Sequence, residues 1–443
     1  MSTATLDTYL RHLVDAGGSD LHLRAGGPPR IRVDGELRAI EGAPLITEAD
    51  TEAIATAIVR PHLAERFRRG EEVDFAYSPK GGPRRFRVNA YMQRDTVALV
   101  FRAVVTQPRT IEELQLPDMV RRFAEEPRGL VIVAGPTGSG KTTTLAAMVD
   151  HVNRSRAAHI VTIEDPIEVV HADVRASISQ RELGTDTPSF ASAMRAALRQ
   201  DPDVVLVGEM RDTATVSAAI SAAETGHLVL TTLHTTDATE TLSRIIEFFP
   251  AHEQRQVRLV LAGVLKGTVC QRLVPRRDRK GRVPATEVMV VNGRVQRWIV
   301  DPAAREDVQE IVADGEYYGM HTFDQSLLAL YQDGLIDLRA ALANASSPHD
   351  LSVRFRRLGI EPSAALAEGD ESEDDAVVHE ALANLVDGLA EPQLEDVPAA
   401  TVPVGSTADG TGDAATDVEV KELRPAPAAA GRRPRLFFFR RRS

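Results

Sequence analysis

The sequence predicts an α/β fold in which helices cover both faces of a parallel sheet. Stretches with helical spacing, such as residues 142–152 and 188–200, alternate with short apolar runs. This alternation is typical of a parallel sheet whose strands are buried on both faces. The apolar runs that predict its strands lie at residues 130–133, 159–163, 204–207 and 226–235.

A glycine-rich stretch follows the first of these strands and predicts a site for phosphate groups. Residues 135–142, GPTGSGKT, fit the P-loop pattern G-x-x-x-x-G-K-[ST] between a strand and a helix, and this context argues against a chance match. The glycines let several backbone N–H groups point into one concavity at the positive end of the helix dipole. Lys141 is expected to reach the outer phosphates, and Thr142 to share a Mg²⁺ ion with them. The predicted binding residues are Gly135, Pro136, Thr137, Gly138, Ser139, Gly140, Lys141, Thr142 and Thr143.

Acidic residues follow two more of the predicted strands. Glu164 comes directly after residues 159–163, and Glu209 comes two residues after 204–207. The carboxyl ends of parallel strands are where such sheets bind ligands, and an acid placed like Glu209 is typical of the Walker B arrangement. We therefore expect Glu209 to hold the metal or its water. The alternative is that Glu209 only caps the helix beginning near Thr213.

Two histidines bracket the strand predicted within residues 226–235. His227 lies at its start and His234 at its end. They are either structural, or they sense phosphate or relay a signal between subunits. The sequence leaves both interpretations open.

Residues 1–107 predict a smaller α/β domain, followed by a linker over residues 108–117. An apolar helical face is formed by Leu6, Tyr9, Leu10 and Leu13. Strands are expected at residues 20–24, 31–33, 73–77, 85–91 and 97–104, with a helix over 48–59.

Arginines lie on or beside the last two of these strands. Arginine on a strand is often only its solvated face, and the alternative is an arginine finger that reaches a neighbouring subunit's phosphates. The residues concerned are Arg85, Arg87, Arg94 and Arg102.

The C-terminal third predicts short helices and then a disordered tail. Helical faces recur through residues 320–357, within a helical region expected over 291–360. Residues 362–420 carry fifteen acids and no Lys or Arg, and residues 421–443 carry eight bases against one acid. Such a composition does not fold by itself, although residues 376–389 could form a docking helix or a transient one. The terminal stretch 432–442 suits an anionic membrane surface, an acidic partner, or the acidic tail itself.

The overall composition excludes several classes of protein. A single cysteine, Cys270, rules out disulfides and four-cysteine zinc modules within these residues. No apolar run approaches the ~20 residues that span a bilayer, so a cytoplasmic protein with peripheral membrane contact is expected. The tail carries −8 of the net charge of −12, and the nearly balanced remainder does not favour nucleic acid as a partner.

Four segments of the chain lie in a characteristic order and read GPTGSGKTTT, TIEDPIE, RQDPDVVLVGEMRD and TGHLVLTTLHTTDA. Together they resemble the nucleotide boxes of the type II/IV secretion ATPase superfamily, and most closely those of the PilT family of type IV pilus retraction ATPases. SDLHL, RFRVNAYMQR and YYGMHTFDQSLLALYQDGLI also resemble that family, so the resemblance covers about residues 5–358.

The resemblance implies an architecture and a function. It implies a RecA-like P-loop core over 118–290, an N-terminal PAS-like domain, and a homohexameric ATPase that binds ATP and Mg²⁺ and powers pilus retraction in twitching motility. Glu164 would be the base for the attacking water, Glu209 the Walker B acid, and His227 and His234 the His box. Nucleotide would sit between the two domains, which supports Arg87, Arg94 and Arg102 as interface arginines. An inner-membrane pilus platform protein is the implied partner.

Other functions remain open from the sequence. Pilus-assembly and type II secretion ATPases typically carry a four-cysteine module and a long N-terminal extension, and both are expected to be absent here. A nucleotide-gated scaffold with little turnover is a second alternative, because residues 293–301 keep the spacing of the corresponding PilT segment only in part. A nucleic-acid motor is disfavoured by the charge.

Overall fold

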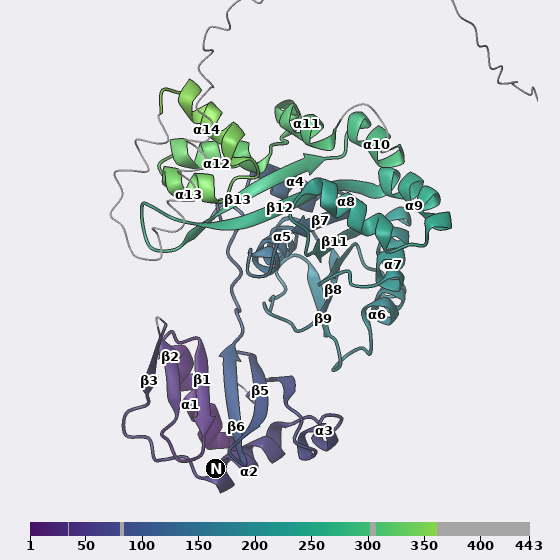
Figure 1. The fold of residues 1–443 in the computed structure, drawn as a ribbon. Helices are drawn as coiled ribbons and strands as arrows, with labels where there is room; N and C mark the ends of the chain where they lie inside the picture. Colours follow the sequence, from purple (N-terminus) through teal and green to yellow (C-terminus); the bar gives the residue numbers. More distant parts are fainter. Residues whose placement is uncertain (34, 80–83, 302–306, 361–443) are drawn as a thin grey trace, which may run out of the picture. The chain divides into compact units, whose positions relative to one another are not determined.

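The computed structural model of the chain describes residues 1–33, 35–79, 84–301 and 307–360, so the predicted disordered tail over 361–443 lies outside the described residues. Figure 1 shows an N-terminal α/β sheet, a second sheet flanked by helices, and a group of short helices after it. Among the described helices, none is both long enough and apolar enough to cross a membrane. The predicted α/β class is confirmed.

The N-terminal sheet is antiparallel throughout, in the order β3-β2-β1-β6-β5-β4. The apolar face predicted for the first helix is buried on this sheet together with Ile54 of the second. Thr47 and Asp50 form a capping box that begins the second helix. The elements are α1 (Thr3–Asp15), β1 (Asp20–Arg24), β2 (Arg30–Val33), β3 (Glu36–Ala39), α2 (Glu48–Ile58), α3 (Ala64–Arg68), β4 (Val73–Tyr77), β5 (Phe86–Gln93) and β6 (Thr96–Ala103).

The second sheet has the order β13-β12-β7-β11-β10-β8-β9 and is parallel except for its edge strand β13, which runs antiparallel to β12. The four apolar runs predicted as strands are β7, β8, β10 and β11. Its elements are α4 (Asp118–Glu125), β7 (Gly129–Ala134), α5 (Lys141–Ser155), β8 (His159–Glu164), β9 (Ser177–Glu182), α6 (Phe190–Ala197), β10 (Val204–Val207), α7 (Thr213–Glu224), β11 (Leu228–Leu233), α8 (Ala238–Glu247), α9 (Ala251–Val264), β12 (Leu265–Pro275) and β13 (Arg282–Val290).

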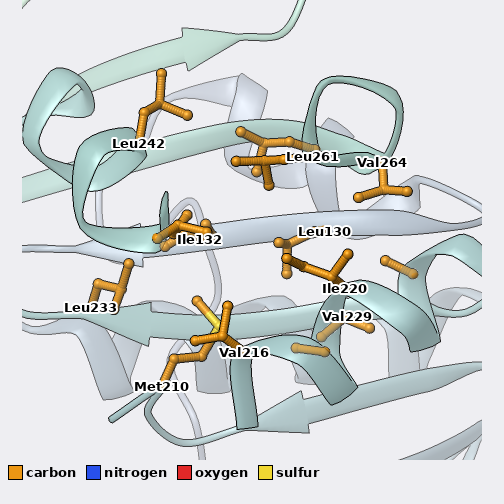
Figure 2. Packing of buried hydrophobic residues seen from close by; sticks show 14 of the residues in the cluster. Leu130, Ile132, Met210, Val216, Ile220, Val229, Leu233, Leu242, Leu261 and Val264 are labelled. Carbon is orange, nitrogen blue, oxygen red and sulfur yellow. The ribbon is translucent and has the colours of Figure 1, made fainter. Parts of the chain in front are cut away.

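Helices cover both faces of this sheet, because alternate residues of each buried strand point to opposite sides. Leu130 and Ile132 of β7 pack with Val216 and Ile220 of α7 in one cluster, which Figure 2 shows. Val131 and Val133, which point to the other side of β7, pack with α4 and α5 in a second cluster. Burial on both faces explains why these strands are continuous apolar runs.

The strands β9, β12 and β13 are absent from the sequence prediction. β9 lies at the sheet edge and reads SISQRE, so apolar patterning does not mark it. The β12–β13 hairpin carries the C-terminal helices, which bury Phe323, Leu351 and Phe355 against Val274 and Val283. The elements that follow β13 are α10 (Gly293–Val300), α11 (Val308–Ala313), a 3-10 helix (Glu316–Tyr318), α12 (Phe323–Gln332), α13 (Leu338–Ala343) and α14 (Pro348–Arg357), and only the last three helices contribute to this cluster.

Candidate active site

The P-loop forms a backbone cradle between β7 and α5. Gly135, Gly138 and Gly140 have φ values of 146°, 80° and 92°, which L residues rarely adopt. A Cβ added at Gly135 would lie 2.4 Å from the carbonyl oxygen of Gln271. The loop therefore needs glycine for its conformation, and at Gly135 also for space.

Gln271 of β12 fastens this loop, and sequence reasoning missed it. Its Nε2 donates to the Ser139 carbonyl at 2.6 Å, and its Oε1 accepts from the Thr144 hydroxyl at 2.8 Å. Gln271 is 1% exposed. One buried amide thus holds both the P-loop and the first turn of α5, although Gln271 lies more than a hundred residues further along the chain. No local sequence pattern indicates this link.

The side chain of Lys141 folds back onto the P-loop. Its Nζ donates to the carbonyl oxygens of Gly135 at 2.7 Å and Pro136 at 3.0 Å. Burial lowers the pKa of Lys141, and the charge of Glu209 opposes that shift. The ammonium group is thus satisfied by two neutral acceptors that an anion can replace.

A cavity of about 500 Å³ opens beside the loop. It is lined by Thr137, Gly138, Gly140, Lys141, Thr142 and Thr143 among the P-loop residues, and by Glu164, Glu209 and His234 from the ends of neighbouring strands. The structure therefore brings together most of the residues predicted for the site. Gly135, Pro136 and Ser139 shape the loop without lining the cavity.

Glu164 ends β8 in a buried position, 9% exposed. Its Oε1 accepts from the Thr162 hydroxyl at 2.6 Å and from Gln180 Nε2 at 3.1 Å. Burial raises the pKa of Glu164 above its ordinary value, while these two donors and a backbone donor at Glu168 oppose the shift. Both side-chain donors bond the same oxygen and neither bonds Oε2.

Glu209 lies in a more polar environment. Its carboxylate pairs with Arg211 Nε at 2.8 Å and lies 3.5 Å from His234 Nε2. The alternative that Glu209 caps α7 is wrong, because Asp212 is the N-cap and accepts from Thr215 N at 2.8 Å. Arg211 lines the cavity as well, and sequence reasoning did not single it out.

The two histidines are separated by the length of β11. His234 lines the cavity at the carboxyl end of that strand. His227 lies at the opposite end, where its carbonyl accepts from Gly129 N and its Nδ1 lies 2.9 Å from the Ala222 carbonyl oxygen. A strand of six residues keeps their side chains apart, so the structure does not bring His227 to this cavity.

None of the predicted arginines lines the cavity. Arg87 lies 3.8 Å from Asp74, and Arg102 lies 2.7 Å from Asp20 on the N-terminal sheet. Arg94 occupies the β5–β6 turn with φ 47°. Arg85 pairs with buried Glu182 at 2.8 Å. Within one chain the structure therefore does not bring these arginines to the cavity.

The cavity offers donors for phosphate groups, and Thr142 and Glu209 are oxygen ligands available there to a Mg²⁺ ion. No group of three or more His, Cys, Asp or Glu side chains placed to hold a metal occurs in the described ranges. The Ser139 hydroxyl is buried without a hydrogen-bond partner at the base of the P-loop. Mg²⁺ commonly takes one or two protein ligands and completes its shell with phosphate and water.

Comparison with known proteins identifies the family. Residues 3–321 match the model of the Type II/IV secretion system protein family. A twitching motility protein of Neisseria gonorrhoeae is 43% identical over 324 residues, 73% of this chain and 86% of that protein. The type IV pilus retraction ATPase PilT of Pseudomonas aeruginosa is 43% identical over 334 residues, covering 75% of this chain and 96% of PilT.

A solved structure supports the same assignment. The crystal structure of the pilus retraction motor PilT with bound ADP matches with a TM-score of 0.70 and 40% identity, over 77% of this chain and 97% of that one. The Legionella pneumophila ATPase DotB matches with a TM-score of 0.62 and 28% identity, over 78% and 97%. The chain therefore belongs to the type II/IV secretion system protein family.

Proposed function

We propose that the chain is a hexameric Mg²⁺-dependent ATPase that powers type IV pilus retraction. The observation that carries the proposal is the position of Glu164, a buried carboxylate facing the same cavity as Lys141 and the P-loop. The PilT relatives named above support retraction as the work performed. By contrast, the type IV pilus assembly ATPase TfpB of Acinetobacter baylyi is 34% identical.

The P-loop residues bind and orient the nucleotide. Backbone N–H groups of the loop and the N-terminus of α5 hold the phosphates, and Lys141 exchanges its two carbonyl partners for phosphate oxygens. Thr142 and Glu209 would hold Mg²⁺, which neutralises charge on the phosphates. Arg211 and His234 fix the Glu209 carboxylate from two sides.

Glu164 acts as general base for the attacking water. Thr162 and Gln180 hold its Oε1, so Oε2 is the atom that accepts the proton of the water. Its raised pKa makes it a stronger base than an exposed carboxylate, which favours proton transfer near neutral pH. Water then cleaves the bond to the γ-phosphate.

The N-terminal arginines would act between subunits of the hexamer. Arg87 and Arg102 lie opposite each other on neighbouring strands with exposed side chains, which supports a role toward a neighbouring subunit's phosphates. The partner implied for the assembled ring is the membrane platform protein of the pilus. Any peripheral contact of the ring with the membrane would use the terminal stretch 432–442.

Substitution of the P-loop lysine tests the proposal. Lys141→Ala is expected to abolish steady-state phosphate release from ATP, because the outer phosphates lose their main positive partner. Lys266→Ala is the matched control, since Lys266 pairs with Glu126 and does not line the cavity. Undiminished phosphate release by Lys141→Ala would overturn the assignment, and negligible release by the unmodified chain would favour the scaffold alternative.

A further inference from the structure

The turn of the β12–β13 hairpin carries a concentration of positive charge that the proposed chemistry does not use. Residues 276–282, RRDRKGR, contain five basic residues and one acid, and we call them the basic hairpin tip. Asp278 neutralises Arg276 through contacts of 2.7 and 2.6 Å. The other basic residues are exposed and form no ion pair within the described ranges, namely Arg277, Arg279, Lys280 and Arg282.

The basic hairpin tip lies beside the nucleotide cavity. With Arg109 and Glu113 it lines a hollow of about 520 Å³. Arg282 belongs to that hollow and also to the nucleotide cavity. A smaller hollow of about 270 Å³, lined by Arg109, Arg279 and the first turn of α5, adjoins both. An anion held at the tip therefore lies next to the place where the nucleotide phosphates bind.

Uncompensated charge of one sign favours a polyanionic partner. Several cations held on one short turn repel one another, and a flexible chain of carboxylates relieves that repulsion while remaining sensitive to salt. Among the described residues that line the larger hollow or belong to the basic hairpin tip, only Asp278 and Glu113 carry negative charge.

The chain itself contains a segment of matching charge. Residues 368–375, EGDESEDD, place six acids in eight positions, within a stretch that has no Lys or Arg from 362 to 420. The described part of the chain ends at Ile360, which packs on the cluster containing Val274 and Val283, the strand residues that lead into the tip. Figure 1 shows helices α12 to α14 beside this hairpin. Eight further residues span up to about 27 Å when extended, so the acidic run can reach the tip.

We propose that residues 368–375 dock on the basic hairpin tip and there compete electrostatically with the nucleotide. The docked carboxylates neutralise Arg279, Lys280 and Arg282, which otherwise attract the phosphates of an incoming nucleotide. A partner that displaces the tail would raise nucleotide affinity. The docking is argued only from the opposite charges of the two segments and from the length of chain between Ile360 and the acidic run. Its effect on nucleotide binding rests on the proposed function.

A cross-linking experiment on the full chain tests the docking directly. Cys270 is 0% exposed, so a cysteine introduced by Ser372→Cys can be labelled selectively with a photoactivatable cross-linker. Cross-links are expected to map to residues 276–282 at low salt and to fall severalfold at about 0.5 M salt, where exposed charges are screened. The double variant Arg279→Gln/Lys280→Gln is expected to lose them. The control Arg255→Gln/Arg297→Gln removes the same charge from exposed positions of α9 and α10 and is expected to keep them.

A nucleotide titration separates this proposal from the proposed function. Replacing the six acids of 368–375 by Asn and Gln is expected to tighten binding of a fluorescent ATP analogue about three- to tenfold at low salt, the range of one or two exposed ion pairs. Cross-links elsewhere, or cross-links equal in both double variants, would overturn the docking. So would binding of the tip to anionic phosphatidylglycerol vesicles without any cross-link. A chain that shows the cross-link but binds no nucleotide would instead contradict the proposed function alone.

Discussion

Two carboxylates at one edge of the sheet differ because their surroundings differ. Glu164 is buried with neutral donors, which leaves its pKa raised. Glu209 is paired with Arg211 and adjoins His234, so its negative charge is compensated. Opposite environments for two nearby acids are a common basis for dividing base and charge-stabilising roles. The division of work proposed for the site therefore follows from burial rather than from residue type.

Glu164→Gln is expected to lower the rate of ATP hydrolysis by about 10²- to 10⁴-fold, the usual contribution of a general base. The amide keeps the size of the side chain but cannot accept a proton from water. Nucleotide binding should persist, because the P-loop is unchanged. Phosphate release and binding of a fluorescent nucleotide, measured on the same preparation, check both parts, and hydrolysis at the unmodified rate would exclude Glu164 as the base.

Glu168→Gln is the matched control at the same edge. Glu168 is exposed, and its charge contributes to the raised pKa of Glu164. Removing that charge should lower the pKa of Glu164 and move the acidic limb of the pH–rate profile to lower pH, while turnover at pH 8 persists. An unmoved acidic limb would show that another group sets it.

Glu287 is another buried carboxylate, outside the nucleotide cavity. It accepts from Ala238 N at 2.8 Å at the start of α8 and lies 3.5 Å from Gln309 Nε2. Burial raises its pKa to about 7, and the nearby charge of Asp237 adds to the shift while Arg272 opposes it. Between about pH 4.5 and pH 7, the folded chain therefore keeps a proton on Glu287 that the unfolded chain has released.

This proton makes stability depend on pH. Between the ordinary carboxyl pKa of 4.5 and about 7, the folded state binds more protons, so the free energy of unfolding falls as pH rises. At about 1.4 kcal/mol per pKa unit, the fall is at most about 3.5 kcal/mol. Glu287→Gln should remove it, and melting temperatures of both chains at pH 5 and pH 8 check this. Equal changes in melting temperature between pH 5 and pH 8 in the two chains would contradict the prediction.

At the scale of elements, the P-loop depends on a strand far away in sequence. Its pattern and flanking elements are predictable because they are local: a buried strand, three glycines and a helix start. The fastening by Gln271 is not predictable, since β12 mixes polar and apolar residues without a regular alternation and the strand that places it beside the P-loop, β7, lies more than a hundred residues earlier in the chain. Gln180 lies on the polar edge strand β9 and was missed for the same reason, whereas Arg211 lies only two residues after Glu209 and could have been singled out from the local sequence.

Gly135→Ala and Gly138→Ala should separate backbone strain from steric clash. Both positions have positive φ, and each substitution is expected to cost about 1 kcal/mol or more in strain. Only at Gly135 does the added methyl group meet the Gln271 carbonyl, while at Gly138 it meets nothing within 4 Å. Gly135→Ala should therefore lower the melting temperature of the nucleotide-free chain clearly more than Gly138→Ala. Equal losses would show that the fastening to Gln271 tolerates displacement.

At the scale of the whole molecule, the class of the fold followed from the alternation of apolar runs and helices. The strands buried on both faces were visible in the sequence, whereas β9 is a polar edge strand and β12 and β13 mix charge with apolar residues. Their place depends on contacts with β7, β8 and the C-terminal helices, which no local pattern encodes. The candidate site was predictable for the same reason as the buried strands, because its residues follow them directly.

Retraction and assembly motors differ in the direction of work, which a cellular phenotype reveals. Deleting the gene in the organism that encodes the chain is expected to leave excess surface pili and to abolish twitching, because filaments still form but are not withdrawn. Complementation with Glu164→Gln should fail to restore motility, since the variant is expected to bind nucleotide without hydrolysing it, whereas Lys266→Ala should restore it. Counting surface pili by electron microscopy alongside a motility assay checks both expectations. Cells without pili would assign the motor to assembly, and because the chemistry at Glu164 and Lys141 would be the same, only the direction of work in the proposal would change.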